Sequence, residues 1–426
     1  MLKVEKIDSA SASLFDTRRQ HIIIFAVCFV LLLTRRPDAI LNAQFWAEDG
    51  KDWYANAYNL GAVKSLFMAH DGYFQTISRI TASIAQAFPL IWAPLIFNIV
   101  ALIFEILPVN LILSSRFSEV IPNKSARLLL AFLYIALPNS VEVHANLTNA
   151  QWHLALLACM VVLAEPSDHK GWQRFDLATV ALSALSGPFS ILLAPVALMR
   201  WIIRRERWIF YLCLLLLGGA LIQAFAFFFI QPSVRPQIAL GATPQLFSRI
   251  IGGQIFLSAL IGQSGYGRLI SHAAWKDIYT VLITLTGFVL ILYSSLTASL
   301  ELRLFILFAA SIIAGALISP AVTETVPQWQ IMWLPKVGGR YWFIPMICFI
   351  ATLIYLQRAA TPRALRIIAA SALLLMPVGI IRDWKYPPMP DLEFKSYAEK
   401  LREVPQGSVV TIPINPPGWS AKLIKH

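Results

Sequence analysis

Three carboxylates lie within five residues near the start of the chain, in the stretch FWAEDGKDWY that begins at Phe45. Glu48 and Asp49 are adjacent, Gly50 permits a sharp turn after them, and Asp52 follows. A carboxylate held beside a bound substrate can take a proton from a reacting hydroxyl group. The plainer interpretation is that Asp49 and Asp52 only cap a helix, and the sequence leaves both interpretations open.

A second polar group consists of His70, Asp71 and Tyr73, with Arg79 six residues after the tyrosine. A cation beside several hydrogen-bonding groups is a candidate for binding a polar substrate. The alternative is a simple turn followed by an arginine that extends its charged end toward water.

A third polar group, in the stretch NLTNAQWH, contains Asn149, Gln151 and His153. Amides and an imidazole both donate and accept hydrogen bonds, so this group suits a hydroxyl-rich ligand. The alternative is that these side chains only satisfy a polar turn at the start of an apolar segment.

Lys336, Arg340 and Tyr341 form a fourth group around a Gly-Gly pair. The glycines allow the backbone to approach a ligand closely, and the planar fork of an arginine matches a phosphate group. The alternative is again an arginine that only extends to water. Glu105 differs because it lies inside an apolar segment, where a carboxylate is either functional or paired with another helix.

These groups belong to a chain of 426 residues that is 58% hydrophobic and 14% charged, with a mean hydropathy of +0.65. So little polar surface cannot cover a soluble fold, and the composition predicts an all-α polytopic membrane protein. Its apolar blocks allow about 10 to 12 transmembrane helices, at about 20 residues for each crossing. The four cysteines lie in apolar blocks and predict neither disulfides nor a zinc site. The net charge of +12 comes from scattered basic residues, which favours membrane lipids over nucleic acid as partners.

The basic residues between the apolar blocks predict the topology. We expect a cytoplasmic N-terminus, a first span at His21 to Leu33, and a first outer loop at residues 34–75 that carries the acidic motif. The next apolar stretch is too long for one crossing, so Pro94 is expected to separate an interfacial helix from the second span. The polytopic domain extends to residue 381.

The segment Leu177 to Met199 has the length of one span, but it ends in the densest basic cluster of the chain, Arg200 to Arg207. A single crossing would place that cluster outside. Gly187 and Pro188 interrupt the segment at its midpoint, and a proline inside a helix removes a hydrogen-bond donor. We therefore expect a short broken hairpin that returns to the cytoplasm, with a turn that lines a cavity.

The stretch between Ile230 and Lys276 has a Gly-rich middle, residues 250–267, that is a candidate for re-entering the membrane. The tail, residues 382–426, contains seven prolines and no long apolar run. It is too short and irregular for an enzyme domain of its own, so we expect it to pack on the extracytoplasmic face.

The chain resembles the GT-C superfamily, polytopic glycosyltransferases that use polyprenyl-phosphate-linked sugars. The resemblance is carried by the acidic pair in the first outer loop, the helices after it, the broken spans in mid-chain and Arg340-Tyr341 at the start of a late span. The stretches Phe45 to Gly50, His70 to Arg79 and Asn149 to Leu154, with the C-terminal INPPGW, look like an uncharacterised bacterial branch of it. Better-studied members often carry a large outer domain, so acceptor recognition does not carry over to this chain.

The resemblance implies an inverting transfer of a sugar from a polyprenyl-phosphate donor to a glycan or lipid acceptor, at the outer face of a bacterial inner (plasma) membrane. Because the phosphate is already a good leaving group, the reaction needs one base and some cations but no general acid. Asp49 is the expected base, and Glu48 either orients it or helps to hold a divalent metal.

Two other classes of protein compete with this hypothesis. One is a transporter or flippase of a lipid-linked saccharide, which should show charged residues in several spans and paired broken helices. The sequence offers chiefly Glu105 and a single break. The other is a non-catalytic membrane assembly subunit, which agrees with every plain interpretation above.

Overall fold

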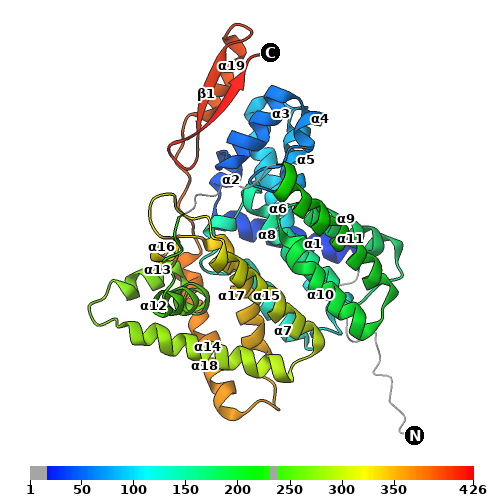
Figure 1. Ribbon diagram of the computed structural model, residues 1–426, viewed down its shortest axis with the longest axis vertical. Coiled ribbons are helices and arrows are strands. Elements are labelled where there is room, and N and C mark those ends of the chain that lie inside the picture. The colour runs from blue at the N-terminus through cyan, green and yellow to red at the C-terminus, as the bar shows by residue number, and fades with distance from the viewer. Residues whose placement is uncertain (1–16, 231–237) are drawn as a thin grey trace.

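The computed structural model describes residues 17–230 and 238–426 as a bundle of helices with a small sheet near the C-terminus (Figure 1). The expected cytoplasmic N-terminus lies outside the described residues. The helices of the first half are α1 (Arg18–Arg35), α2 (Asp38–Leu41), a π-helical turn (Asp49–Tyr54), α3 (Ala55–Leu60), α4 (Ala62–Leu66), α5 (Thr76–Ala85), α6 (Ala93–Leu113), α7 (Lys124–Ile135), α8 (Leu147–Leu163), α9 (Lys170–Ala184) and α10 (Phe189–Arg204).

The second half continues the bundle and ends in a two-stranded antiparallel sheet. Its elements are α11 (Arg207–Phe225), a π-helical end (Ala226–Ile230), α12 (Pro244–Ser248), a π-helical stretch (Arg249–Leu257), α13 (Ser258–Ile270), α14 (Asp277–Thr297), α15 (Leu300–Ile318), α16 (Gln328–Met332), α17 (Gly339–Tyr355), α18 (Arg363–Asp383), α19 (Phe394–Glu403), β1 (Val409–Ile414) and β2 (Trp419–Ile424).

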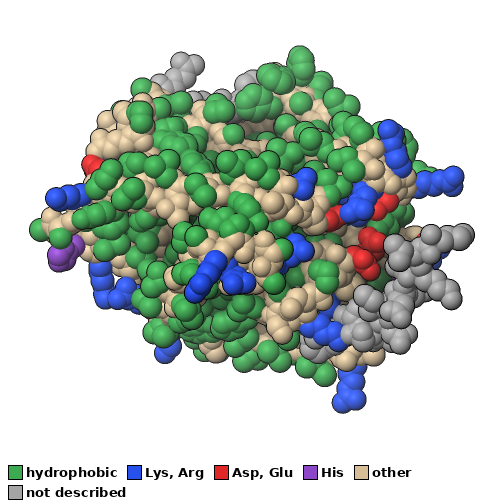
Figure 2. Space-filling model, turned by 90° about the horizontal axis from the view of Figure 1, so that it is seen from below, with side chains coloured by type: hydrophobic (Ala, Val, Ile, Leu, Met, Phe, Trp, Pro, Cys, Tyr) green, Lys and Arg blue, Asp and Glu red, His purple; other side chains and the backbone are tan. Residues whose placement is uncertain are grey.

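Among the described residues, six helical runs are long and apolar enough to cross a membrane. They are Leu90–Leu113, Arg207–Ile230, Pro244–Ile270, Asp277–Thr297, Leu300–Ile318 and Arg363–Asp383. Large apolar side chains on α11, α14 and α18 are exposed, and Figure 2 shows apolar side chains over much of one face, with basic side chains in small groups. A soluble protein rarely exposes so much apolar surface. The all-α polytopic membrane fold is therefore confirmed, while the total of 10 to 12 spans stays a prediction.

The bundle has two ends, which helix α8 connects. Its first residues, Leu147 and Thr148, contact Asp49, and near its last residue the carbonyl of Val162 accepts a hydrogen bond from Arg200 (2.5 Å). A helix of 17 residues is about 25 Å long at about 1.5 Å per residue. We call these the Asp49 end and the Arg200 end.

Helices α9 and α10 form the expected broken hairpin, with its turn at the Asp49 end. Gly187 has a φ of +81°, which glycine adopts without strain. Its N–H donates to the carbonyl of Phe74 (2.9 Å), and its carbonyl accepts from Gln223 of α11 (3.1 Å). Protein groups thus satisfy the backbone of the turn, and a cavity lined by the turn stays a prediction.

The other ends of this hairpin lie at the Arg200 end. Arg116 makes two hydrogen bonds to Asp176 of α9 (2.6 and 2.9 Å), and Arg200 pairs with Glu206 (3.0 Å). Arg204 pairs with Glu301 at the start of α15 (2.8 Å). The basic cluster and the acidic motif therefore lie at opposite ends of the bundle, as the hairpin hypothesis requires.

The run Pro244–Ile270 is long enough for a span, but it folds back on itself. A Cβ on Gly253 would lie 2.3 Å from the hydroxyl of Tyr266, whereas the two positions would be about 20 Å apart along a straight helix. The reversal includes Gly262, which has a φ of +75°. At depth, Phe256 packs on Phe349 in the middle of α17, with ring centroids 4.7 Å apart. The segment thus folds back on itself as a re-entrant segment would, and its re-entry into the membrane stays a prediction.

Two expectations need correction. The interfacial helix α5 is separated from α6 at Pro89 and not at Pro94, because Pro94 lies in the first turn of α6, where a missing N–H costs no hydrogen bond. The tail is not irregular either, since it contains α19 and the sheet. Phe394 of α19 packs on Phe45 with ring centroids 5.3 Å apart, and Asn415 bridges to the backbone of Phe45 and Ala47. The tail thus packs on the acidic segment, above α3 and α5 in Figure 1.

We predict that cysteines placed at Arg204 and Lys51 are labelled from opposite sides of the membrane by an impermeant thiol reagent. Both positions are exposed, and the four native cysteines are buried, so the background is low. A cysteine at the exposed Lys336 serves as the control and should behave like the one at Lys51. Labelling of Arg204→Cys from the Lys51 side would contradict the hairpin topology.

Candidate functional site

The Asp49 carboxylate is fully buried at the first turn of α8. Its Oδ2 accepts from the backbone N–H of Leu147 (3.1 Å), and its Oδ1 accepts from the N–H and the hydroxyl of Thr148 (both 2.8 Å). The first N–H groups of a helix have no partner within the helix, and they attract negative charge. Asp49 therefore caps a helix, as the plainer interpretation expected, but the helix is α8 and lies about a hundred residues further along the chain.

The backbone around Asp49 is fixed by close packing. Gly50 does not make the expected sharp turn, because it lies within the π-helical turn Asp49–Tyr54. A Cβ there would be 3.1 Å from both Ile414 and Phe45, so glycine lets the tail strand β1 approach. Helix α3 follows this turn and ends at Gly61, which has a φ of +93°.

The pKa of Asp49 favours the role of a general base, whereas its buried position favours a structural role. Burial raises the pKa of Asp49 to about 7, against the opposing effect of the hydrogen bonds from Thr148 and Leu147. A pKa near neutrality suits a general base. However, the side chain is 0% exposed and both of its oxygens are engaged, so a substrate has no path to it in this conformation.

Glu48 is the carboxylate that stays partly exposed. Burial raises its pKa above the ordinary value of 4.5, Asp52 raises it further, and Arg340 and His70 act in the opposite direction. Arg340 and His70, which come from segments far from Glu48 in the sequence, both influence this carboxylate electrostatically. Within the described residues, no other side chain is hydrogen-bonded to it. Because Glu48 is partly exposed and has no side-chain partner among the described residues, it is available to a ligand.

Asp52, His70 and Arg79 meet around the ring of Trp53. The guanidinium of Arg79 lies 4.7 Å from the ring centroid and donates to the backbone carbonyl of Asp52 (3.3 Å). His70 packs edge-on against the same ring at 4.9 Å, with its Nδ1 4.0 Å from Asp52 Oδ1. Arg79 is buried, so the alternative of an arginine that extends to water is wrong. Asp71 is exposed beside His70, and Tyr73 bonds to the backbone of His70.

Arg340 is tied to the loop before α8. Its Nη1 pairs with Glu142, and its backbone N–H donates to the same carboxylate (3.2 Å). Its Nη2 donates to the carbonyl of Ala321 (2.8 Å) and to the hydroxyl of Tyr341 (3.3 Å). These contacts fix the guanidinium in place while 29% of the side chain stays exposed. Lys336, in the loop before α17, is exposed.

The side chains of the third polar group bond to the neighbouring loops. Asn149 donates to the carbonyl of Glu142 (2.9 Å), and Gln151 accepts from Gln75 beside the hairpin turn (3.2 Å). His153 is buried between Tyr134 (2.8 Å) and the carbonyl of Val143 (3.0 Å). For these three residues the structure supports the interpretation of a satisfied polar turn.

Glu105 is paired with His144, which agrees with the interpretation of a paired carboxylate. Its Oε1 lies 3.0 Å from Nδ1 of His144, and both side chains are buried. Among the described residues, no group of three or more His, Cys, Asp or Glu side chains could hold a metal ion. A divalent metal at Glu48 therefore stays an untested prediction.

Sequence reasoning missed three residues of the site: Trp53 as the platform for Arg79, Thr148 as the partner of Asp49, and Glu142 as the partner of Arg340. Each makes its contact with a segment far away in the chain, and no local pattern marks such a pair. A weak signal existed only for Glu142, a lone acidic residue in a short loop between apolar blocks.

No model of a known protein family matches the chain, and no curated protein matches it. Among solved structures, the chain is similar to the Archaeoglobus fulgidus oligosaccharyltransferase, crystallised in complex with zinc and sulfate. The two chains are 14% identical with a TM-score of 0.45, and the likeness covers 90% of this chain and 56% of that one. The chain thus matches little more than half the length of this neighbour. At this level of similarity, function has to be argued from the site.

We predict that Asp49→Asn lowers the free energy of unfolding by about 1–3 kcal/mol, because an amide nitrogen would face one of the buried donors and leave it without an acceptor. Thermal unfolding in lipid nanodiscs measures this. Asp71→Asn, at a side chain that is 63% exposed, is the matched control and should change stability by less than about 0.5 kcal/mol. An Asp49→Asn protein as stable as the wild type would show that these hydrogen bonds do not hold the fold.

Proposed function

We propose that this chain is an integral membrane glycosyltransferase that transfers a sugar, with inversion, from a polyprenyl-phosphate donor to a glycan or lipid acceptor at the Asp49 end. The observation that carries the proposal is the partly exposed Glu48, on which Arg340 and His70 act electrostatically. Direct displacement of a phosphate requires one base and nearby positive charge, and this cluster offers both.

In this proposal Glu48, and not Asp49, takes the proton from the acceptor hydroxyl. A base must reach within hydrogen-bond distance of the proton that it removes, and Glu48, unlike Asp49, is a partly exposed residue. Asp49 is a positioning residue, since it fixes the neighbouring backbone against α8. The raised pKa of Glu48 makes it a stronger base than an ordinary glutamate.

Arg340 is proposed to contact the phosphate of the donor. Its guanidinium is held by Glu142 and by Ala321, so little side-chain entropy is lost when the remaining donors bind an anion. His70 and the exposed Lys336 add positive charge to the same end of the bundle when they are protonated. The donor's lipid chain would lie against the apolar outer surface of the bundle.

A transporter of a lipid-linked saccharide is the second candidate, because the structure contains two broken hairpins instead of one. The turn of α9–α10 lies at the Asp49 end, and the reversal near Gly262 lies in the run Pro244–Ile270. Paired broken helices are typical of transporters. The substitution Glu48→Gln separates the glycosyltransferase from the transporter, because transport does not need a base at Glu48.

We predict that Glu48→Gln lowers the rate of sugar transfer by about 10²- to 10⁴-fold, because the amide cannot accept the acceptor's proton. Release of free polyprenyl phosphate from a panel of polyprenyl-phosphate sugars measures the rate. Glu324→Gln, at an exposed glutamate in the loop before α16, is the control and should keep wild-type activity. Near-normal transfer by a folded Glu48→Gln protein would remove Glu48 from the mechanism.

We predict that Arg340→Ala weakens donor binding by about 1.5 to 3 kcal/mol, and that Arg340→Lys restores only part of it because lysine lacks the fork. Affinity for the donor lipid and thermal stability should be measured together. Glu142→Gln is the comparison, since it loosens Arg340 without removing its charge. If Arg340→Ala only destabilises the protein and donor affinity is unchanged, the arginine is structural.

A further inference from the structure

A hollow of about 390 Å³ lies between the two arms of the folded-back run Pro244–Ile270 and the start of α14. Arg249 comes from one arm and Tyr266 from the other, while Trp275 lies in the loop before α14 and Asp277 is the first residue of that helix. Trp333, from the loop before α17, closes the opposite side. The volume is within the range of about 300–1,000 Å³ that is typical of ligand pockets. None of these residues belongs to the Glu48 site.

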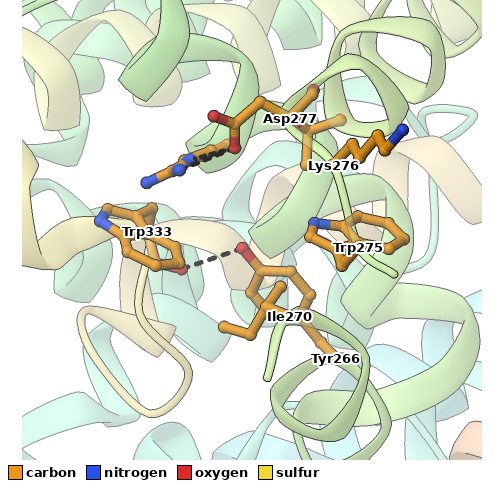
Figure 3. Close-up of a pocket in the computed structure, with 8 residues that line it drawn as sticks. Tyr266, Ile270, Trp275, Lys276, Asp277 and Trp333 are labelled. Carbon is orange, nitrogen blue, oxygen red and sulfur yellow. Dashed lines mark hydrogen bonds and ion pairs between the residues drawn. The ribbon is translucent and has the colours of Figure 1, made fainter. Parts of the chain in front are cut away.

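Three aromatic rings surround the open space. Figure 3 shows Trp333 and Trp275 on opposite sides of it and Tyr266 below, with Asp277 above. The hydroxyl of Tyr266 donates to the backbone carbonyl of Trp333 (3.1 Å), and its oxygen can still accept a hydrogen bond. Such a lining offers flat apolar faces with polar groups at their edges.

The polar groups in the hollow form a neutral pair. Arg249 stacks on Trp333, 4.5 Å from the ring centroid, and its Nε and Nη2 both donate to Asp277 Oδ1 (2.8 and 2.7 Å). The Nη1 of Arg249 has no partner among the described residues. Lys276 also lines the hollow, but its ammonium group points away from the rings in Figure 3.

The paired charges of Arg249 and Asp277 favour an uncharged ligand over an anion. A phosphate would meet the Asp277 carboxylate, and like charges repel each other. A sugar is uncharged, with an apolar C–H face and hydroxyl groups that donate and accept hydrogen bonds. The rings suit that face, while Arg249 Nη1, the Asp277 carboxylate and the Tyr266 hydroxyl suit the hydroxyl groups.

We propose that this hollow is a saccharide-binding subsite for a sugar unit of the acceptor that does not react. The choice of the acceptor rests on the proposed function, because the donor's reacting sugar has to lie at Glu48. The loop Trp333–Arg340 joins the hollow to the Glu48 site. Gln254 holds this loop by donating to the carbonyl of Met332 (2.9 Å) and to that of Leu334 (2.5 Å).

The test is saturation-transfer NMR on the full chain in phosphatidylcholine nanodiscs, with maltose, cellobiose, lactose and N,N′-diacetylchitobiose as probes. We expect saturation of at least one disaccharide. Trp275→Ala should weaken its binding by about 3- to 10-fold, in line with the loss of one aromatic contact. Trp92→Ala is the matched control, because Trp92 is a 53% exposed tryptophan at the start of α6, away from the hollow.

Other outcomes overturn the subsite. These are no saturation of any probe, equal binding by Trp275→Ala and the wild type, or displacement of the sugar by inorganic phosphate, which would make the hollow an anion site. The measurement needs no catalysis, so Glu48→Gln should bind sugar like the wild type. If the Glu48→Gln protein binds sugar and also transfers it at the full rate, the subsite stands and the proposed base is wrong.

Discussion

The buried carboxylate of Asp49 at the start of α8 is the contact on which the rest of the site depends. Three donors from Leu147 and Thr148 converge on it in a place closed to water. A buried charge without partners would be costly, so the acidic segment cannot leave α8 without a large loss of stability. Asp49 is fully buried, whereas Glu48 next to it stays partly exposed, and Arg340 and His70 act on Glu48. One carboxylate anchors the segment, and the other is the proposed base.

The chain reverses direction at two places where a helix is broken. Gly187 turns α9 into α10 beside Phe74, and the chain between Gly253 and Tyr266 folds back next to α17. Both are held by protein hydrogen bonds or close packing, which is how non-helical backbone is tolerated at membrane depth. The first turn supports the segment before α5, and the second forms the wall of the hollow at Trp333. The two candidate binding regions thus depend on breaks in helices more than on the long spans.

Much of the architecture could be predicted from the sequence because a membrane imposes simple rules. Apolar length, the position of Pro188 and the cluster after Arg200 were enough to predict the hairpin and its direction. The role of Asp49 could not be predicted, since its partner Thr148 is distant in the chain and nothing local marks the pair. The strands of the tail were missed for a similar reason, because their buried side chains belong to the apolar cluster that contains Phe45. Local patterns predict which segments cross the membrane, but contacts between segments decide which carboxylate is exposed.

The most direct test of this account is the pH dependence of kcat/KM for sugar transfer in the wild type, Glu48→Gln and Asp49→Asn. Burial holds the pKa of Glu48 above 4.5, so wild-type activity should rise with pH through a value above that number as the base loses its proton. We expect this rise to be absent from the residual activity of Glu48→Gln and still present in Asp49→Asn. A rise that persists in Glu48→Gln and disappears in Asp49→Asn would make Asp49 the base and contradict the central claim.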